Sequence, residues 1–80
     1  MHYEDLTITE LIYTESGWYA KLTSNFGGTF NFHVADSNIE ESELLENNIV
    51  IGRKLLGVIV GNKLVTLNEF TFINSKSRSK

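Results

Sequence analysis

The 80-residue sequence contains no cysteine and no proline, and it has only two histidines, His2 and His33. The absence of cysteine excludes disulfides and thiolate metal sites as sources of stability. Two histidines are too few for a histidine-rich metal site. A chain of this length buries only about 60 to 65 per cent of its unfolded surface, so it needs an efficient apolar core. We therefore expect no metal and no small-molecule cofactor.

The sequence also lacks a long hydrophobic run. Its longest apolar stretch, Leu55–Val60, is far shorter than the roughly 20 residues of a membrane-spanning helix. The first five residues, Met1–Asp5, carry Glu4 and Asp5 and do not resemble a secretory signal. These absences predict a cytoplasmic protein with no membrane partner.

Positive charge is scarce in most of the chain. Three of the seven lysines and arginines lie in the last five residues, so residues 1–75 hold four cations and all ten acids, a net charge of −6. We expect residues 1–75 to form a single acidic β-barrel domain. Residues 76–80 offer no apolar side chain to bury, which predicts a disordered basic tail.

The first half of the chain has the composition of β-strands. Three segments rich in β-branched and aromatic residues, 6–14, 18–23 and 29–34, are separated by turns that contain glycine. In the third segment, strict alternation places Phe30, Phe32 and Val34 on one face, which we expect to face the core.

The second half opens with a helix signal and returns to strands. Ser37–Glu40 has the spacing of a capping box, and Asn47–Asn48 is a natural end for a helix of two to three turns. A long strand over Ile49–Val60 is expected to bend at Gly52 and Gly57. The remaining expected elements are a hairpin turn at Gly61–Asn62, a strand over 64–67, and a segment, 70–73, that closes the sheet or packs beneath it.

This order of elements predicts a mainly β protein. The expected architecture is a small five-stranded antiparallel barrel of the oligonucleotide/oligosaccharide-binding (OB) type, with one short helix between strands three and four. A small Sm-like barrel is the main alternative, although that fold usually begins with its helix. An open β-sandwich or meander is the other alternative.

The layout resembles that of cold-shock domains, which are compact OB barrels of similar length. Ser16–Ala20 stands where the family has an aromatic-glycine motif on strand two, Thr29–Val34 where it has a motif ending in His-Phe on strand three, and Gly61–Lys63 where it turns into its last strand. The resemblance implies an OB barrel that binds single-stranded RNA or DNA. The sequence departs from the pattern at Asn31 and Ala20, where the family has exposed aromatic residues.

No set of residues in the sequence meets the requirements of an enzyme. Catalysis needs a nucleophile beside a base, or paired carboxylates in a cleft. Alternation places His33 on the exposed face of its strand, and the sequence positions no serine, lysine or carboxylate beside it. The glutamates of the expected helix lack the ligand spacing of a calcium loop. We therefore expect no enzymatic activity.

The sequence thus favours a binding module. The first hypothesis is an acidic, non-enzymatic barrel that binds a protein partner or associates with itself, and the alternative is cold-shock-like binding of single-stranded RNA or DNA. Nucleic-acid binding depends strongly on cations that neutralise phosphates, and the acidic charge of residues 1–75 opposes it. The candidate binding residues are Tyr19, Lys21, Asn31, His33, Arg53 and Lys54.

Overall fold

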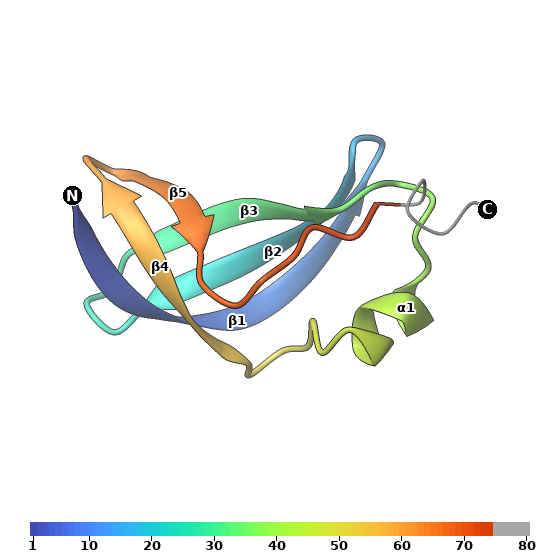
Figure 1. Cartoon of the computed structure of the whole chain (residues 1–80), viewed down its shortest axis with the longest axis horizontal. Coiled ribbons are helices and arrows are strands. Elements are labelled where there is room, and N and C mark those ends of the chain that lie inside the picture. Colours follow the sequence, from blue (N-terminus) through green and yellow to red (C-terminus); the bar gives the residue numbers. More distant parts are fainter. Residues whose placement is uncertain (75–80) are drawn as a thin grey trace.

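The structure, a computed structural model, describes residues 1–74 and is a nearly closed antiparallel β-barrel (Figure 1). The five strands are arranged in the order β3-β2-β1-β4-β5, and one short helix lies between β3 and β4. The expected mainly β fold, its strand count and the position of its helix are confirmed. The predicted basic tail, 76–80, lies outside the described residues. The elements are β1 (His2–Thr14), β2 (Gly17–Ser24), β3 (Thr29–Ala35), α1 (Glu41–Glu46), β4 (Lys54–Val60) and β5 (Lys63–Leu67).

The 13-residue strand β1 organises the barrel. Its first half pairs with β4 and its second half with β2, and both partners meet at Leu6, which lies opposite Ser24 and Leu55. The register with β2 shifts between Ile8 and Glu10. Such a bulge bends a strand and increases its twist, which helps a sheet to curl into a barrel.

The C-terminal segment closes one end of the barrel. The amide of Ile73 donates to the carbonyl of Val34 at 3.0 Å, and the amide of Asp36 donates to the carbonyl of Ile73 at 3.1 Å, which makes a parallel bridge to the end of β3. Phe70 and Ile73 also pack against the core. The segment was predicted either to close the sheet or to pack beneath it, and the structure shows both a bridge to β3 and packing against the core.

The core is formed by side chains of every strand, of α1 and of its flanking loops. Val34 is fully buried as expected, whereas Phe30 and Phe32 are half-buried and pack against the core from its edge. The buried cluster comprises Leu6, Ile8, Ala20, Leu22, Val34, Ala35, Ile39, Leu44, Ile49, Leu55 and Leu67.

The predicted start of the helix was wrong. The N-cap is Glu40, whose amide donates to the Glu43 carboxylate at 3.4 Å, and not Ser37. Ser37 instead lies in a turn, where its carbonyl accepts a hydrogen bond from the Tyr13 hydroxyl at 2.9 Å. The predicted end of the helix is confirmed, because Asn47 is the C-cap.

The predicted strand over Ile49–Val60 was correct only in its second part. The chain turns until β4 begins at Lys54, with the left-handed φ angles of Asn48 (62°) and Gly52 (98°) on either side of Ile49. The amide of Ile49 donates to the carbonyl of Leu44 at 2.8 Å and therefore completes the helix end. The hairpin turn at Gly61–Asn62 is confirmed.

Candidate functional site

Four of the predicted binding residues lie together on the outer face of β2 and β3. Tyr19 lies opposite His33, and Lys21 lies opposite Asn31, in the register of the two strands. Arg53 and Lys54 are not part of this group, because Lys54 lies on β4 and β1 separates β4 from β2. The structure therefore places the six predicted residues in two separate regions.

His33 is partly covered by neighbours, whereas the sequence predicted an exposed side chain. Its ring stacks on Tyr19, with centroids 4.7 Å apart and planes 20° apart, and the edge of Phe72 meets it at 4.9 Å. Its Nε2 lies 2.9 Å from the carbonyl oxygen of Ser16, to which an Nε2 proton donates. The sequence did not predict the contact with Phe72, because the bridge at Ile73 brings that ring to β3.

Two of the predicted cations bind other groups of the same chain. The Lys21 ammonium lies 3.9 Å from the Glu10 carboxylate on the neighbouring strand. The Arg53 guanidinium donates to the carbonyl of Asn48 at 3.0 Å and to that of Glu69 at 2.9 Å. Arg53 therefore joins the loop after α1 to the segment after β5, which is a structural role.

The helix packs at the end of the barrel that also carries the β1–β2 hairpin (Figure 1). The Trp18 indole donates to the carbonyl of Ile39 at 2.7 Å, and the Tyr13 ring lies 4.9 Å from the indole. Within α1, Leu44 is fully buried, whereas the next residue, Leu45, is 60% exposed. The helix thus contributes one leucine to the core and presents another to solvent.

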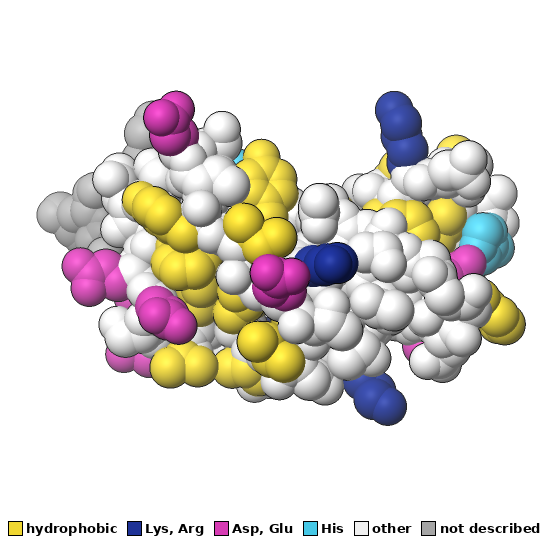
Figure 2. All heavy atoms as spheres, turned by 180° about the vertical axis from the view of Figure 1, so that it is seen from behind, with side chains coloured by type: hydrophobic (Ala, Val, Ile, Leu, Met, Phe, Trp, Pro, Cys, Tyr) yellow, Lys and Arg dark blue, Asp and Glu magenta, His cyan; other side chains and the backbone are white. Residues whose placement is uncertain are grey.

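Apolar and acidic side chains lie together at this end of the molecule. Figure 2 shows the molecule from behind, with the helix end on the left. Apolar side chains gather on this left half together with several acidic ones, while lysine and arginine side chains lie on the right half. We call this region the helix-end surface and define it by exposed residues of α1, of its flanking loops and of the β1–β2 hairpin, which contacts the loop before α1. Its residues are Tyr13, Glu40, Glu41, Leu45, Glu46 and Ile51.

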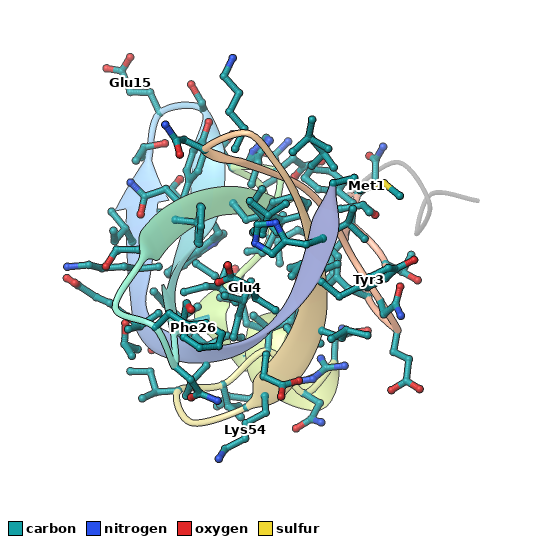
Figure 3. All side chains as sticks on the ribbon, turned by 90° about the vertical axis from the view of Figure 1, so that its left-hand side faces the viewer. Met1, Tyr3, Glu4, Glu15, Phe26 and Lys54 are labelled. Atoms are coloured by element: carbon teal, nitrogen blue, oxygen red, sulfur yellow. The ribbon has the colours of Figure 1, made fainter. Side chains whose placement is uncertain are left out.

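The opposite end of the barrel contains a pocket of about 400 Å³, which we call the barrel mouth. Glu4 points into this pocket from the first part of β1 (Figure 3), and its side chain is only 15% exposed. The sequence did not single out Glu4, yet alternation along β1 places it on the same inward face as Leu6 and Ile8. The mouth is lined by His2, Glu4, Phe26, Gly28, Thr29, Phe30, Ile59, Gly61 and Asn62.

Hydrogen bonds hold the Glu4 carboxylate in place. The Ser24 hydroxyl donates to it, and His2 Nε2 lies 2.5 Å from its Oε2. The hydrogen bond from Ser24, followed by that from His2, lowers the pKa of Glu4 below its ordinary value of 4.5, while desolvation acts in the opposite direction. The carboxylate is therefore ionised at neutral pH, with acceptor sites that remain open, since a carboxylate has about four.

This arrangement is suited to recognition. In a hydrolase triad the histidine faces the serine, whereas here the Glu4 carboxylate lies between Ser24 and His2 and accepts from both. Residues 1–74 contain no group of three or more His, Cys, Asp or Glu side chains that could hold a metal ion. In the same range, no helix has the length and apolar character needed to span a membrane.

No protein-family model, curated protein or solved structure matches this chain. The functional argument therefore rests on the geometry of the outer face of β2 and β3, the helix-end surface and the barrel mouth.

Proposed function

We propose that this protein is a non-enzymatic interaction module that binds a protein partner through the helix-end surface. The observation that carries the proposal is the exposure of Leu45, which is 60% accessible in a helix that already buries Leu44. Its exposed helical neighbours include Glu41 and Glu46. An apolar side chain among carboxylates is typical of an interface with an apolar centre and a polar rim.

The chemistry of this surface specifies the partner. Carboxylates accelerate the approach of a basic surface and repel an acidic one, so the partner should carry lysines or arginines around an apolar patch. Pairing of two copies through the same surface would bring carboxylates against carboxylates. Self-association would therefore use a strand edge, either that of β3 or that of β5, between which a groove of about 370 Å³ remains.

The test uses the full chain as bait, with Leu45→Arg as the variant and Val65→Arg as its matched control. Val65 is 50% exposed on β5, so the control adds the same charge to another exposed apolar position. We expect a specific protein to be captured from lysate by the wild type and the control, and to be lost with Leu45→Arg and at high salt. Identical capture by all three baits would contradict the proposal. Sedimentation of the wild type measures self-association separately.

The ring contacts on β2 and β3 favour a second candidate function, cold-shock-like binding of single-stranded RNA or DNA. Tyr19, His33 and Phe72 form a continuous aromatic cluster at the outer face. Stacking of one base on an exposed aromatic ring contributes about 1–3 kcal/mol. The acidic charge and the Glu10–Lys21 ion pair oppose phosphate binding, which makes this the weaker candidate.

A labelled oligothymidine tests this candidate by fluorescence anisotropy at low salt. We expect that binding, if the aromatic cluster provides it, is lost in Tyr19→Ala and kept in Tyr3→Ala, because Tyr3 is an exposed tyrosine on another strand. A flat titration of the wild type would eliminate this function. Intrinsic tryptophan fluorescence is a poor reporter here, since the Trp18 indole is bound to Ile39.

A further inference from the structure

We propose that the barrel mouth binds an organic cation, either a primary ammonium or a guanidinium group, with Glu4 as its ion partner and Phe26 and Phe30 as aromatic walls. The proposal does not depend on the helix-end surface, which lies at the other end of the barrel (Figure 1).

The size and lining of the mouth suit a small ligand or a long side chain. Its volume of about 400 Å³ falls within the roughly 300–1,000 Å³ of small-molecule pockets, which often occupy the mouths of β-barrels. Phe26, Phe30 and Ile59 supply apolar wall, and Thr29 and Asn62 add polar groups at the rim. An alkyl chain that ends in a charged group matches such a lining.

The charge of the pocket selects the sign of the ligand. Among the described residues, Glu4 is the only one with a carboxylate that lines it, and its side chain is 15% exposed, so it is partly desolvated. The hydrogen bonds from Ser24 and His2 keep it ionised but do not use all of its acceptor sites. A cation that enters gains a charge-assisted hydrogen bond in a partly dry site, whereas an anion is repelled.

Phe26 supplies an independent argument. It is 86% exposed at the β2–β3 turn, so it has no role in the core, yet its ring borders the mouth (Figure 3). A cation held against the face of an aromatic ring is stabilised by the ring quadrupole. An exposed phenylalanine beside a half-buried carboxylate thus provides both attractions that organic cations use.

Ser24 connects Glu4 with the turn that carries Phe26. Its oxygen accepts a hydrogen bond from the Phe26 amide at 2.9 Å, and its hydroxyl donates to the Glu4 carboxylate. Ser24 is 5% exposed, so these two bonds fix it in place. Ser24 is therefore a positioning residue that holds the turn carrying Phe26 against the strand that carries Glu4.

The test is an NMR titration of the ¹⁵N-labelled full chain with three probes. n-Pentylamine represents a free cation, Nα-acetyl-lysine methylamide represents a lysine displayed on a peptide, and Nα-acetyl-norleucine methylamide is the uncharged control. We expect saturable shifts of the Glu4, Ser24 and Phe26 amides with at least one cationic probe and none with the norleucine probe. The cationic probe that binds more tightly identifies the source of the cation.

Matched variants assign the binding to the mouth. Glu4→Gln should weaken the cation about tenfold, the loss expected for a hydrogen bond to a charged group. Asp5→Asn removes the same charge from the exposed neighbouring residue and should leave the affinity within about twofold. Phe26→Ala should weaken it about threefold and should not disturb folding, because the ring is exposed.

Three results would overturn the proposal. They are the absence of saturable shifts with both cations, equal binding of the norleucine probe, and equal losses in Glu4→Gln and Asp5→Asn. If Glu4→Gln fails to fold, the comparison of Phe26→Ala with the wild type still tests the proposal. Unchanged affinity for the cation in Phe26→Ala would contradict the role of Phe26 as an aromatic wall of the site. Loss of this site would leave the helix-end proposal unaffected, since neither Glu4 nor Phe26 belongs to that surface.

Discussion

The two ends of the barrel differ in how exposed their carboxylates are. At the helix end, Leu44 and Ile49 are buried and seal the core, while Glu41 and Glu46 remain in solvent. At the mouth, no helix within residues 1–74 covers the barrel, and the carboxylate of Glu4 occupies the inward position that precedes Leu6 along β1.

This contrast shows how one small barrel can offer two different kinds of binding site. A broad surface of apolar and acidic groups suits a macromolecular partner, whose contacts are spread over many side chains. A single carboxylate inside a pocket suits one cationic group, because the pocket removes water from the pair and fixes its geometry. Each prediction below tests the account of one end or compares the two.

The largest expected effect distinguishes the structural leucine of α1 from its exposed neighbour. Leu44→Ala should lower the free energy of unfolding by about 3 kcal/mol, through lost burial and the cavity left behind. Leu45→Ala should change it by less than about 0.5 kcal/mol, because Leu45 is 60% exposed. Urea denaturation monitored by far-UV circular dichroism measures both. Equal losses would mean that Leu45 stabilises the fold and would remove the main support for the helix-end surface.

The hairpin turns at the two ends should differ in their tolerance of a side chain. Gly17, with a φ of 125°, leaves no room for a Cβ, which would lie 2.3 Å from the Ala35 carbonyl oxygen and 2.7 Å from His33 Nε2. Gly17→Ala should therefore cost about 2–3 kcal/mol of unfolding free energy, from the backbone strain together with the clash.

Gly27→Ala is the matched change at the mouth. Gly27 has a φ of 95°, but a Cβ there would meet nothing within 4 Å. Only the backbone strain remains, so we expect a cost of about 1 kcal/mol. Thermal denaturation of both variants measures the difference. A loss for Gly27→Ala as large as that for Gly17→Ala would show that the turn carrying Phe26 is packed as tightly as the helix end.

Sequence patterns predicted the strands well because each strand signal is local. Alternation over 29–34 and the Gly61–Asn62 turn depend only on neighbouring residues, and the structure has both. The helix start and the first part of the strand over Ile49–Val60 were wrong, because hydrogen bonds that alternation and capping patterns do not reveal determine both. Tyr13 holds the carbonyl of Ser37, and the amide of Ile49 completes the end of α1.

The candidate sites were harder to predict for the same reason. The pairing of Tyr19 with His33 followed from two neighbouring strands, so the sequence predicted their common face. Phe72 reaches His33 only because the chain returns at Ile73. Glu4 shares its inward face with Leu6, but only the meeting of β1 with the β2–β3 turn shows that this face opens into a pocket.

The smallest expected effect is a pH dependence of stability that belongs to the mouth. The pKa of Glu4 is lowered in the folded state, first by the hydrogen bond from Ser24 and then by that from His2. A carboxyl group whose pKa falls on folding stabilises the protein fully above its unfolded value and loses this contribution as the pH drops through the folded value. The advantage of the wild type over Glu4→Gln should therefore be complete above the ordinary pKa of 4.5 and should shrink below it.

Urea denaturation of both proteins at several pH values between about 6 and 3 measures this change. Among the residues that line the mouth, His2 is the other titratable group, and in the variant it faces a neutral amide oxygen in place of a carboxylate. Asp5→Asn is the control, because Asp5 is exposed and the pKa of Glu4 should be unaffected by it to first order. If the gap between the wild type and Glu4→Gln stayed constant across this range, the Glu4 carboxylate would be a solvated surface charge. The two ends of the barrel would then differ in shape, but the carboxylates of both would be solvated.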